Sequence, residues 1–479
     1  MLKHIIPKSK FCIKSKPIQY YYSTLIKENV KQGFHIHPKL NYDYLAANAT
    51  AIQQNMKNRD YGRIDMNQFV DLNNERIKLK KDLKLLVAEQ DKVNANMHKA
   101  IKSSQSVAQE WIKKGKQLKL EIKPIQEKIS QIENQLLTQG LQIPNETHPD
   151  SPIGSEENAR IMKIIGSPRN EDQYRLKDHL DIAAELNILD LKQAALGSGT
   201  SFYYLQGMGA FLELALIQYA MHKANAKGFF GVLTPDIIRT QVAYGCGFQP
   251  RSDEHSQIYH IYTKSQEDPS MCLAGTAEIP LAAKVATRLF SEQELPIRLA
   301  GFGHAFRTEA GGLGTDPKGL YRVHQFSKVE LFAVTTPDQS EAMMNEIRDL
   351  QEDMFTELGL CFRILDMPTE ELGASAYRKY DMEAWMPGRR KWGEISSTSN
   401  CTDYQARRLS IRYCLKDHKL NPGNAFFCHT LNGTAIAVPR IIIAILETFQ
   451  QQDGSVRIPS VLRKWMPGEP EYMTPSKSF

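Results

Sequence analysis

The fold of this 479-residue chain is decided by two stretches. The first is FRTE at residues 306–309, followed after a glycine-rich loop by YRVHQFSKVEL at 321–331. The second is TLNGTAIAVP at 430–439, followed by Arg440 and the apolar run IIIAILE at 441–447. The first stretch predicts a strand, a tight loop and a second strand, and the second predicts a strand that leads into a helix.

Arg307 and Arg440, which lie at these two junctions, indicate how a nucleotide would be bound. The chain contains neither a glycine-rich Walker loop nor a Rossmann fingerprint. A guanidinium group donates to two phosphate oxygens at once, in a geometry that fits phosphate well. The sequence therefore predicts that arginine side chains hold the phosphates of a nucleotide triphosphate.

The two stretches resemble motifs 2 and 3 of the class II aminoacyl-tRNA synthetases and, in detail, those of the seryl-tRNA synthetases. The seryl pattern is matched in order by TAE at 276–278, FRTEAG at 306–311, HQFSKVE at 324–330 and EISS at 394–397, while GVLTPD at 231–236 fits motif 1. The resemblance covers roughly residues 150–470 by motif and 40–145 by pattern alone. Several separated motifs in one order are far more specific than any one of them.

The resemblance implies an α+β fold, in which the antiparallel sheet of a class II synthetase is flanked by helices and preceded by an N-terminal antiparallel coiled-coil arm. A catalytic domain is expected over residues 146–479, with motif 1 near 228–240, motif 2 near 303–332 and motif 3 near 430–450. Residues 35–145 are expected to form a tRNA-binding helical hairpin. Residues 138–200 contain several turn signals and are interpreted as a connector, with an ordered segment beginning at Asp178.

Residues 69–137 carry the clearest periodicity in the chain. Leucine, valine and methionine repeat at alternating three- and four-residue steps from Leu72 to Met97, and a second run extends from Leu118 to Leu136. A polar break that includes Gly115 separates them, so the pattern predicts an antiparallel hairpin of two helices, each about 30 residues and about 45 Å long. Pro124 is expected to kink the second helix or to mark a local start.

The hairpin is also the basic part of the chain. Residues 76–128 hold fourteen Lys and Arg against six Asp and Glu, whereas the whole chain has a net charge of +6. A lysine-rich helix is often only a solvated face, and a coiled coil often only a spacer or a dimer contact; beside a synthetase-like body, nucleic-acid binding is the favoured interpretation. The expected tRNA-binding lysines are Lys78, Lys80, Lys81, Lys84, Lys113, Lys114, Lys116 and Lys119.

The N-terminal segment is basic as well. Residues 1–27 contain six Lys and no acidic residue, which is typical of a mitochondrial presequence. We therefore expect a presequence over residues 1–30 and a mitochondrial enzyme; the alternative is a basic tail on a cytoplasmic one. No run of 18 apolar residues predicts a membrane span. The seven cysteines are scattered without a CxxC pair, so most are expected to be small buried residues and no zinc site is predicted.

The resemblance also implies the roles of individual residues in serine activation, with ATP and Mg²⁺ as the nucleotide substrate and the cofactor. Arg307 would bridge the serine carboxylate and the α-phosphate, while Arg440 would hold the far phosphates and stack on adenine opposite Phe326. Glu309 would accept from the adenine amino group, and Glu394 with Ser397 would supply oxygen ligands to Mg²⁺. The expected ATP-binding set is Arg307, Thr308, Glu309, Val323, Phe326, Glu394, Ile395, Ser396, Ser397 and Arg440.

The expected serine pocket is small and polar, and consists of Thr276, Ala277, Glu278, Arg307, Glu330 and Thr434. Thr276 and Glu278 would bind the ammonium group of serine, while Glu330 and Thr434 would bind its hydroxyl. Alanine would be rejected, because it leaves buried polar groups without partners. Since the attacking serine carboxylate is already ionised, the reaction needs alignment and charge neutralisation more than a general base.

The resemblance implies a homodimeric seryl-tRNA synthetase that binds L-serine and tRNA(Ser). Two alternatives stay open at this point. A ligase that charges a carrier protein would lack the long arm, and a synthetase-like paralogue with a binding or regulatory role would be expected to lose motif arginines, which are present here.

Two departures from the seryl pattern are Pro439 before Arg440 and the loop 311–319, which lacks the aromatic and arginine residues often found there.

Overall fold

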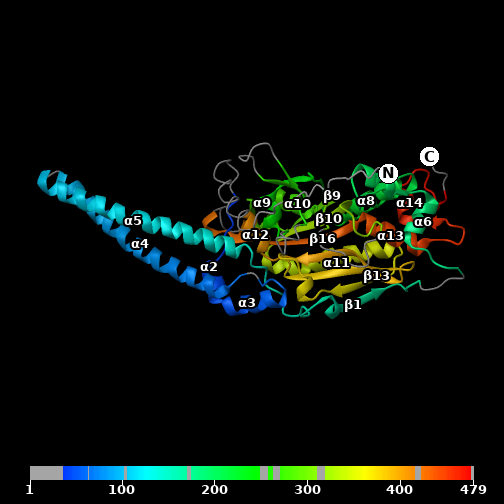
Figure 1. The fold of residues 1–479 in the computed structure, drawn as a ribbon, viewed down its shortest axis with the longest axis horizontal. Coiled ribbons are helices and arrows are strands. Elements are labelled where there is room, and N and C mark those ends of the chain that lie inside the picture. Colours follow the sequence, from blue (N-terminus) through cyan, green and yellow to red (C-terminus); the bar gives the residue numbers. More distant parts are fainter. Residues whose placement is uncertain are drawn as a thin grey trace, which may run out of the picture.

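The computed structural model describes residues 36–62, 64–101, 105–169, 174–248, 257–262, 270–309, 319–415 and 422–475. The expected presequence, residues 1–30, and residues 310–318 of the motif 2 loop lie outside the described residues. Figure 1 shows a long helical hairpin projecting from a body built around one large sheet.

The large sheet has eight strands, and all neighbouring pairs are antiparallel except the last. This arrangement confirms the predicted α+β class II architecture. The strands are, in spatial order, β1 (Arg160–Ile165), β11 (Phe362–Asp366), β12 (Arg378–Met386), β13 (Lys391–Asn400), β16 (His429–Ala437), β10 (Gln325–Thr335), β9 (Ile297–Phe306) and β4 (Phe230–Leu233).

One face of the sheet is covered by helices. They are α6 (His179–Leu186), α8 (Met208–Ala226), α11 (Ser340–Glu357) and α13 (Val438–Phe449). Alternate residues of a strand point to opposite faces, and in β10 Val329 and Leu331 belong to this helical core whereas Phe332 belongs to a second cluster on the other side. Lys328 and Glu330 therefore share the face opposite the helices.

The second face carries a smaller layer that covers only part of the sheet. Its helices are α9 (Thr240–Gly245), α10 (Glu278–Val285) and α12 (Tyr404–Leu409), and its strands are β5 (Ile237–Arg239), β6 (His260–Ile261), β7 (Met271–Leu273), β8 (Leu289–Ser291), β14 (Arg412–Cys414) and β15 (Phe426–Phe427). The part of this face that stays uncovered carries the cleft described below.

The predicted hairpin is present and longer than expected. Helices α4 (Met66–Ile101) and α5 (Gln105–Gly140) have 36 residues each, which corresponds to about 54 Å. The interpretation of Gly115 as part of the turn was wrong, because it lies inside α5. Pro124 does not interrupt α5 either. Proline has no N–H, so the carbonyl oxygen of Leu120, four residues earlier, receives no helix hydrogen bond from it. Both residues are exposed, so water can reach this carbonyl.

Two short helices, α2 (Tyr42–Ala47) and α3 (Ala49–Asn58), pack against the root of the hairpin through a cluster that includes Met56, Phe69 and Leu136. The interpretation of residues 138–200 as a connector was partly wrong, because β1 lies within it and forms one edge of the large sheet. The ordered segment predicted to begin at Asp178 is α6, whose first amides are capped by the Asp178 carboxylate.

The remaining elements are short connections and C-terminal pieces. They are η1 (Glu156–Asn158), β2 (Leu189–Asp190), α7 (Leu191–Gly197), β3 (Tyr204–Leu205), η2 (Glu292–Glu294), η3 (Pro337–Gln339), η4 (Thr369–Glu371), η5 (Pro422–Asn424), β17 (Val456–Arg457), α14 (Ser460–Arg463) and β18 (Tyr472–Met473). Within the described parts of the chain, no helix combines the length and the apolar character that crossing a membrane requires.

Candidate active site

The structure brings most of the predicted site residues to one cleft on the uncovered face of the sheet. The half expected to bind the nucleotide, called the nucleotide half below, is lined, among others, by Arg307, Glu309, Val323, Phe326, Glu394, Ile395, Ser396, Ser397, Thr434 and Arg440. A wider cavity continues from it to Thr276, Glu278 and Glu330. Thr308 and Ala277 adjoin these residues in the chain but do not line either cavity.

Two β-bulges shape the floor of the cleft. In β16 the partner of Val329 is Ile436 and that of Glu330 is Thr434, so Ala435 is an extra residue. In β13 the same displacement makes Ile395 an extra residue beside Glu394. A bulge changes the direction of neighbouring side chains and is common next to active sites. The bulges therefore lie at the residues whose side chains enter the cleft.

Gln351, a buried residue of α11, supports both bulges from the opposite face of the sheet. Its amide nitrogen donates to the carbonyl oxygens of Ser397 and Thr434, each at 3.0 Å. Gly433 allows this approach, because a Cβ there would lie 2.4 Å from Ile347 and 2.9 Å from the Gln351 amide nitrogen. The helix that backs the sheet thus positions the strands that line the cleft.

The predicted serine pocket contains a cation that the sequence analysis did not single out. The Lys328 ammonium lies 2.6 Å from a Glu330 carboxylate oxygen and donates to the Thr276 hydroxyl at 3.1 Å. The hydroxyl groups of Thr276 and Thr434 are each 3.5 Å from the same Glu330 oxygen. Lys328 could have been found from its spacing, because it lies two residues before Glu330 and so on the same face of the strand.

Glu278 is positioned by two amides from elsewhere in the chain. One of its carboxylate oxygens accepts from the side chains of Gln405 at 2.6 Å and Asn432 at 2.9 Å. Burial, and after it the negative charge of Glu330, raises the pKa of Glu278 to about 7. The carboxylate is therefore less costly to keep charged when a cation, such as an amino-acid ammonium group, lies beside it.

The opposite end of the cleft is cationic. The Arg307 guanidinium lies 5.5 Å from the centre of the Phe326 ring, and its Nε donates to the Gly275 carbonyl at 3.3 Å. Burial and the neighbouring charge of Arg440 lower the pKa of Arg307 from its ordinary value. A guanidinium nevertheless stays protonated in proteins. Two partly buried cations that repel one another are a suitable environment for a polyanion such as a triphosphate.

Arg440 is paired with Glu394 in this structure. Its guanidinium donates to a Glu394 carboxylate oxygen at 2.9 Å and to the Glu394 carbonyl at 3.1 Å. Burial alone would raise the pKa of Glu394, but the charges of Arg440 and Lys379 bring it down to about 2. Glu394 is therefore a carboxylate at neutral pH and offers anionic oxygen to a cation in the cleft.

Tyr321 lies under two guanidinium groups, those of Arg440 and Arg389, each 4.8 Å from its ring centre. Its hydroxyl oxygen accepts from the Glu394 amide at 2.9 Å. Arg389 and Tyr321 were not among the predicted site residues. Tyr321 stands in the quoted motif and could have been considered, whereas Arg389 comes from the turn between β12 and β13, which only the folded chain brings here.

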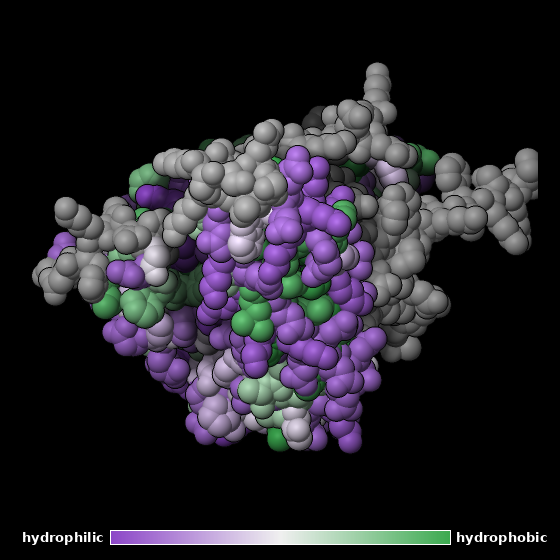
Figure 2. Space-filling model, turned by 90° about the vertical axis from the view of Figure 1, so that its left-hand side faces the viewer, coloured by the Kyte–Doolittle hydropathy of each residue, from purple (hydrophilic) through white to green (hydrophobic). Residues whose placement is uncertain are grey.

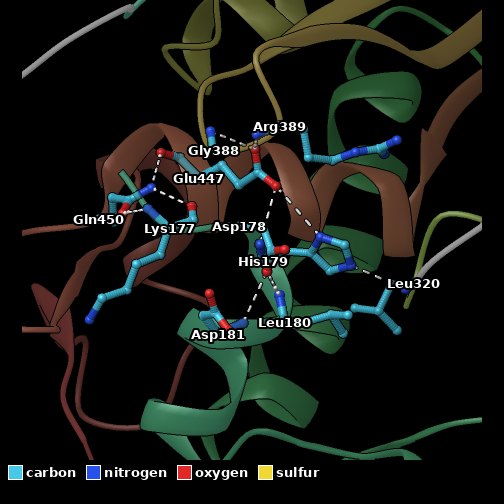
Figure 3. A network of polar contacts seen from close by, with 10 residues as sticks. All are labelled: Lys177, Asp178, His179, Leu180, Asp181, Leu320, Gly388, Arg389, Glu447 and Gln450. Atoms are coloured by element: carbon cyan, nitrogen blue, oxygen red, sulfur yellow. Dashed lines mark hydrogen bonds and ion pairs between the residues drawn. The ribbon is translucent and has the colours of Figure 1, made fainter. Parts of the chain in front are cut away.

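A buried network behind this end of the cleft fixes that turn (Figure 3). The amides of Gly388 and Arg389 donate to one carboxylate oxygen of Glu447 in α13, at 2.9 and 3.1 Å, and the His179 amide donates to the other at 3.1 Å. The His179 ring accepts from the Leu320 amide at 3.4 Å. The network therefore connects α13, the β12–β13 turn and the described end of the motif 2 loop.

A second charged pair borders the cleft beside Ser397. Lys379 and Asp381 lie on β12 with their charged atoms 2.7 Å apart, and Asp381 is the cross-strand partner of Ser397. Burial, which outweighs the Lys379 charge, raises the pKa of Asp381 to about 7. The sequence analysis missed both residues, because nothing in their own segment indicates that β12 and β13 pair in this register.

Comparison with known proteins identifies the family of this chain. Residues 261–449 match the family described as tRNA synthetase class II core domain (G, H, P, S and T), and residues 40–147 match the seryl-tRNA synthetase N-terminal domain. The serine–tRNA ligase of Treponema denticola is 40% identical over 426 residues, which cover 88% of this chain and 97% of that protein. The mitochondrial serine–tRNA ligase of Schizosaccharomyces pombe is 43% identical over 431 residues, which cover 88% and 87%.

A solved structure is similar over nearly the whole chain. The seryl-tRNA synthetase from Pyrococcus horikoshii, complexed with ATP, has a TM-score of 0.82 and 32% sequence identity, with 91% of this chain and 100% of that chain covered. The matched N-terminal domain and the full-length similarity argue against the alternative of a carrier-protein ligase without an arm. The chain belongs to the seryl-tRNA synthetase family of class II aminoacyl-tRNA synthetases.

Proposed function

We propose how this serine–tRNA ligase divides its reaction among the residues of the cleft. Serine binds at the end that contains Thr276, Glu278 and Glu330, and ATP binds at the end that contains Arg307 and Arg440. The serine carboxylate then attacks the α-phosphorus and pyrophosphate leaves. The observation that carries the proposal is that the polar pocket around Glu330 and the two arginines open into one continuous cavity.

The two arginines would act mainly on charge and alignment. Arg307 lines both the nucleotide half and the wider cavity, so it is suited to contact the serine carboxylate and the α-phosphate together. Arg440 would hold the distal phosphates, with adenine between its guanidinium and Phe326. Glu309 and the backbone of Val323, which line the same half, would bind the edge of adenine. Prepositioned charges of this kind stabilise the transition state without a general base.

The donor set of the cleft fits Mg²⁺ as the partner of ATP. Glu394 is ionised and Ser397 offers a hydroxyl oxygen, and both are the hard oxygen ligands that Mg²⁺ prefers. Among the described residues, no group of three or more His, Cys, Asp or Glu side chains is placed to hold a metal ion. Glu394 and Ser397 would hold the Mg²⁺, and the bound ion would neutralise phosphate charge.

Selection of serine would depend on its hydroxyl. The Glu330 carboxylate and the Thr434 hydroxyl lie together in a buried site, and a ligand without a hydroxyl would leave them partly unsatisfied. Glu278 would bind the ammonium group together with Thr276, whose hydroxyl accepts from the Glu278 amide at 3.3 Å.

The hairpin of α4 and α5 would bind tRNA(Ser). All eight predicted lysines are exposed, and two of them form ion pairs within the hairpin, Lys80 with Glu133 at 2.6 Å and Lys114 with Glu89 at 2.8 Å. Figure 2, which views the molecule from the hairpin side, shows mostly hydrophilic residues with apolar ones between them. Such a surface suits contacts to the RNA backbone and shape more than to base sequence.

The motif 1 region would form the contact of a homodimer. Phe230, Leu233 and Ile237 are 66%, 79% and 53% exposed, and Leu214 of the adjacent α8 is 52% exposed. A group of large apolar side chains that face solvent usually marks an interaction surface. Because β4 is an edge strand of the large sheet, a second copy could cover this group.

We place the enzyme in the mitochondrial matrix, with the cytoplasm as the alternative. The support is the acid-free basic segment 1–27 together with the similarity to mitochondrial relatives; bacterial relatives are about as similar. A reporter fused to residues 1–30 should enter mitochondria and lose the segment. A reporter that stays in the cytosol uncleaved would contradict the placement.

Exchange of pyrophosphate into ATP with a panel of amino acids tests the proposed activity. Serine alone should support exchange, without tRNA, and the exchange should require Mg²⁺. Equal exchange with threonine or alanine would contradict the serine pocket described here. A second assay measures the transfer of serine to tRNA(Ser), which the same enzyme preparation should also catalyse.

A further inference from the structure

Arg59 connects the root of the tRNA arm to the catalytic cleft. It follows α3 and is fully buried, although it carries a charge. Its guanidinium donates to the carbonyl oxygens of Asn145 at 2.6 Å, Gly373 at 2.5 Å and Ala376 at 3.0 Å. It therefore holds together the arm root, the end of the arm and the segment 369–377 of the catalytic domain, which we call the cleft loop.

Further contacts join the same three segments. The Thr369 hydroxyl donates to the Asn58 carbonyl at 2.5 Å. The Asn145 amide donates to the Ala374 carbonyl at 2.8 Å, and its side chain donates to the Ser375 carbonyl at 2.8 Å. Since hydrogen bonds of a charged donor are stronger than neutral ones, Arg59 contributes the strongest of these links.

The linked segments form part of the wall of the wide cavity. The turn after Arg59 contributes Asp60, Tyr61 and Gly62, and the cleft loop contributes residues 373–376. Thr276, Glu278 and Glu330 line the same cavity, and so do Glu394 and Arg440 at its far end. The smaller nucleotide half, which contains Phe326 and Val323, is lined by none of these segments. Asp60 has the left-handed φ of 55°, so the turn keeps a strained backbone where it meets the cavity.

The cleft loop is also in contact with the residues that hold Glu278. Ser375 packs on Gly247 so closely that a Cβ on that glycine would lie 2.9 Å from the Ser375 Cβ. The neighbouring Cys246 carbonyl accepts from the Gln405 side chain at 3.2 Å, and Gln405 donates to Glu278. A continuous series of contacts thus runs from Arg59 through the cleft loop to the carboxylate at the serine end.

We propose that Arg59 is a positioning residue for the serine half of the active site, so that the root of the tRNA arm is a structural part of the amino-acid pocket. This inference rests on the proposed function of that pocket. Without the Arg59 guanidinium, the cleft loop would lose its attachment at Gly373 and Ala376, and the support of Gln405 and Glu278 would loosen. The ATP half would keep its own network behind Arg440.

The test is a comparison of Michaelis constants in serine-dependent ATP–pyrophosphate exchange by the full-length enzyme. Arg59→Ala should raise the serine KM about ten-fold, since a misplacement of about 1 Å caused by a distant mutation can already cost about 100-fold in rate. The ATP KM should change less than about two-fold. Arg59→Lys, which keeps the charge and part of the donors, should restore part of the serine affinity.

A matched control is Arg76→Ala. Arg76 is a buried arginine of the same arm, but its partners Asp43, Asn73 and Glu133 all belong to the arm. This variant should leave the serine KM unchanged. If Arg59→Ala does not fold, the serine KM is measured in Asn145→Ala instead, because this variant loses the side-chain hydrogen bond to the Ser375 carbonyl.

The outcomes separate the two proposals. Wild-type enzyme without serine-dependent exchange would reject the proposed function itself. Wild-type exchange with an unchanged serine KM in the folded Arg59 and Asn145 variants, or with equal rises in the serine and ATP KM values, would overturn the role of Arg59. Thermal unfolding of each variant shows whether a change in KM merely follows a loss of folded protein.

Discussion

Arg440 donates to the Glu394 carboxylate at 2.9 Å, so the cation expected to bind phosphate and the anion expected to bind Mg²⁺ neutralise one another in this structure. The pair lies where the triphosphate would be placed, and a bound ATP with Mg²⁺ would give each member a new partner of opposite charge. Each of these partly buried charges therefore has a partner both in this structure and in the proposed complex, which limits the cost of removing them from water.

Glu394→Gln tests the metal role of this pair. The amide keeps the shape but loses the negative charge, so the Mg²⁺ concentration at half-maximal exchange should rise about 10- to 100-fold. Glu383→Gln is a matched control, because Glu383 is the cross-strand partner of Glu394 but pairs with Arg363 at 2.7 Å. A Glu394 variant with the Mg²⁺ requirement of the wild type would show that Mg²⁺ is bound elsewhere.

Arg307→Ala should reduce serine-dependent exchange by on the order of 10²–10³, because a lost contact to the reacting phosphate acts on the transition state. Binding of tRNA, measured by filter retention, should remain close to that of the wild type. Arg298→Ala is the control: Arg298 lies on β9, the strand that ends just before Arg307, but it pairs with Glu346 at 2.8 Å and does not line the cleft. Near-normal exchange by the Arg307 variant would disprove its placement at the α-phosphate.

The pKa of Glu278 predicts a pH dependence. Its value of about 7 lies above the ordinary value of 4.5, so the protonated form is favoured in the folded enzyme. Between about pH 4.5 and 7, Glu278 is ionised in the unfolded chain but still protonated in the folded enzyme, so the free energy of unfolding falls as pH rises. This loss of stability is complete above the folded pKa. In the proposed complex, Glu278 must be ionised to bind the serine ammonium group.

The serine KM should therefore fall as pH is raised from about 6 to 8. Glu278→Gln should raise the KM, remove most of this dependence and increase the melting temperature above pH 7 relative to the wild type. Measuring exchange and thermal unfolding over this range at constant ionic strength provides both readouts. A serine KM in the wild type that does not vary with pH would contradict the titration of Glu278.

Removal of residues 76–128, with a short turn joining the remaining helix ends, should spare serine activation and severely weaken aminoacylation. The cluster that holds the arm root, including Met66, Phe69, Ile132 and Leu136, lies outside the deletion, and so does Arg59. In the intact enzyme, tRNA affinity should fall steeply with salt, as phosphate contacts require. If the enzyme without residues 76–128 aminoacylated tRNA fully, the arm would be only a spacer.

The sequence alone determined the features that depend on local pattern. Heptad spacing predicted α4 and α5, and the stretches around Arg307 and Arg440 predicted the strands β9, β10 and β16 and the helix α13. These predictions succeed because side-chain periodicity and turn residues act over a few neighbouring positions. Gly115 was misplaced for the complementary reason: packing against the partner helix keeps a glycine helical despite its low propensity.

Only the tertiary structure decided which distant residues complete the site. Gln405 and Asn432 reach Glu278 from 127 and 154 residues away, and Arg59 reaches Ala376 across 317 residues. Such contacts depend on strand register, on two β-bulges and on how the arm root docks, and none of these leaves a pattern in the segment concerned. The sequence determined the elements and the two arginines at their junctions, while the buried hydrogen bonds between elements decided how the pocket is held.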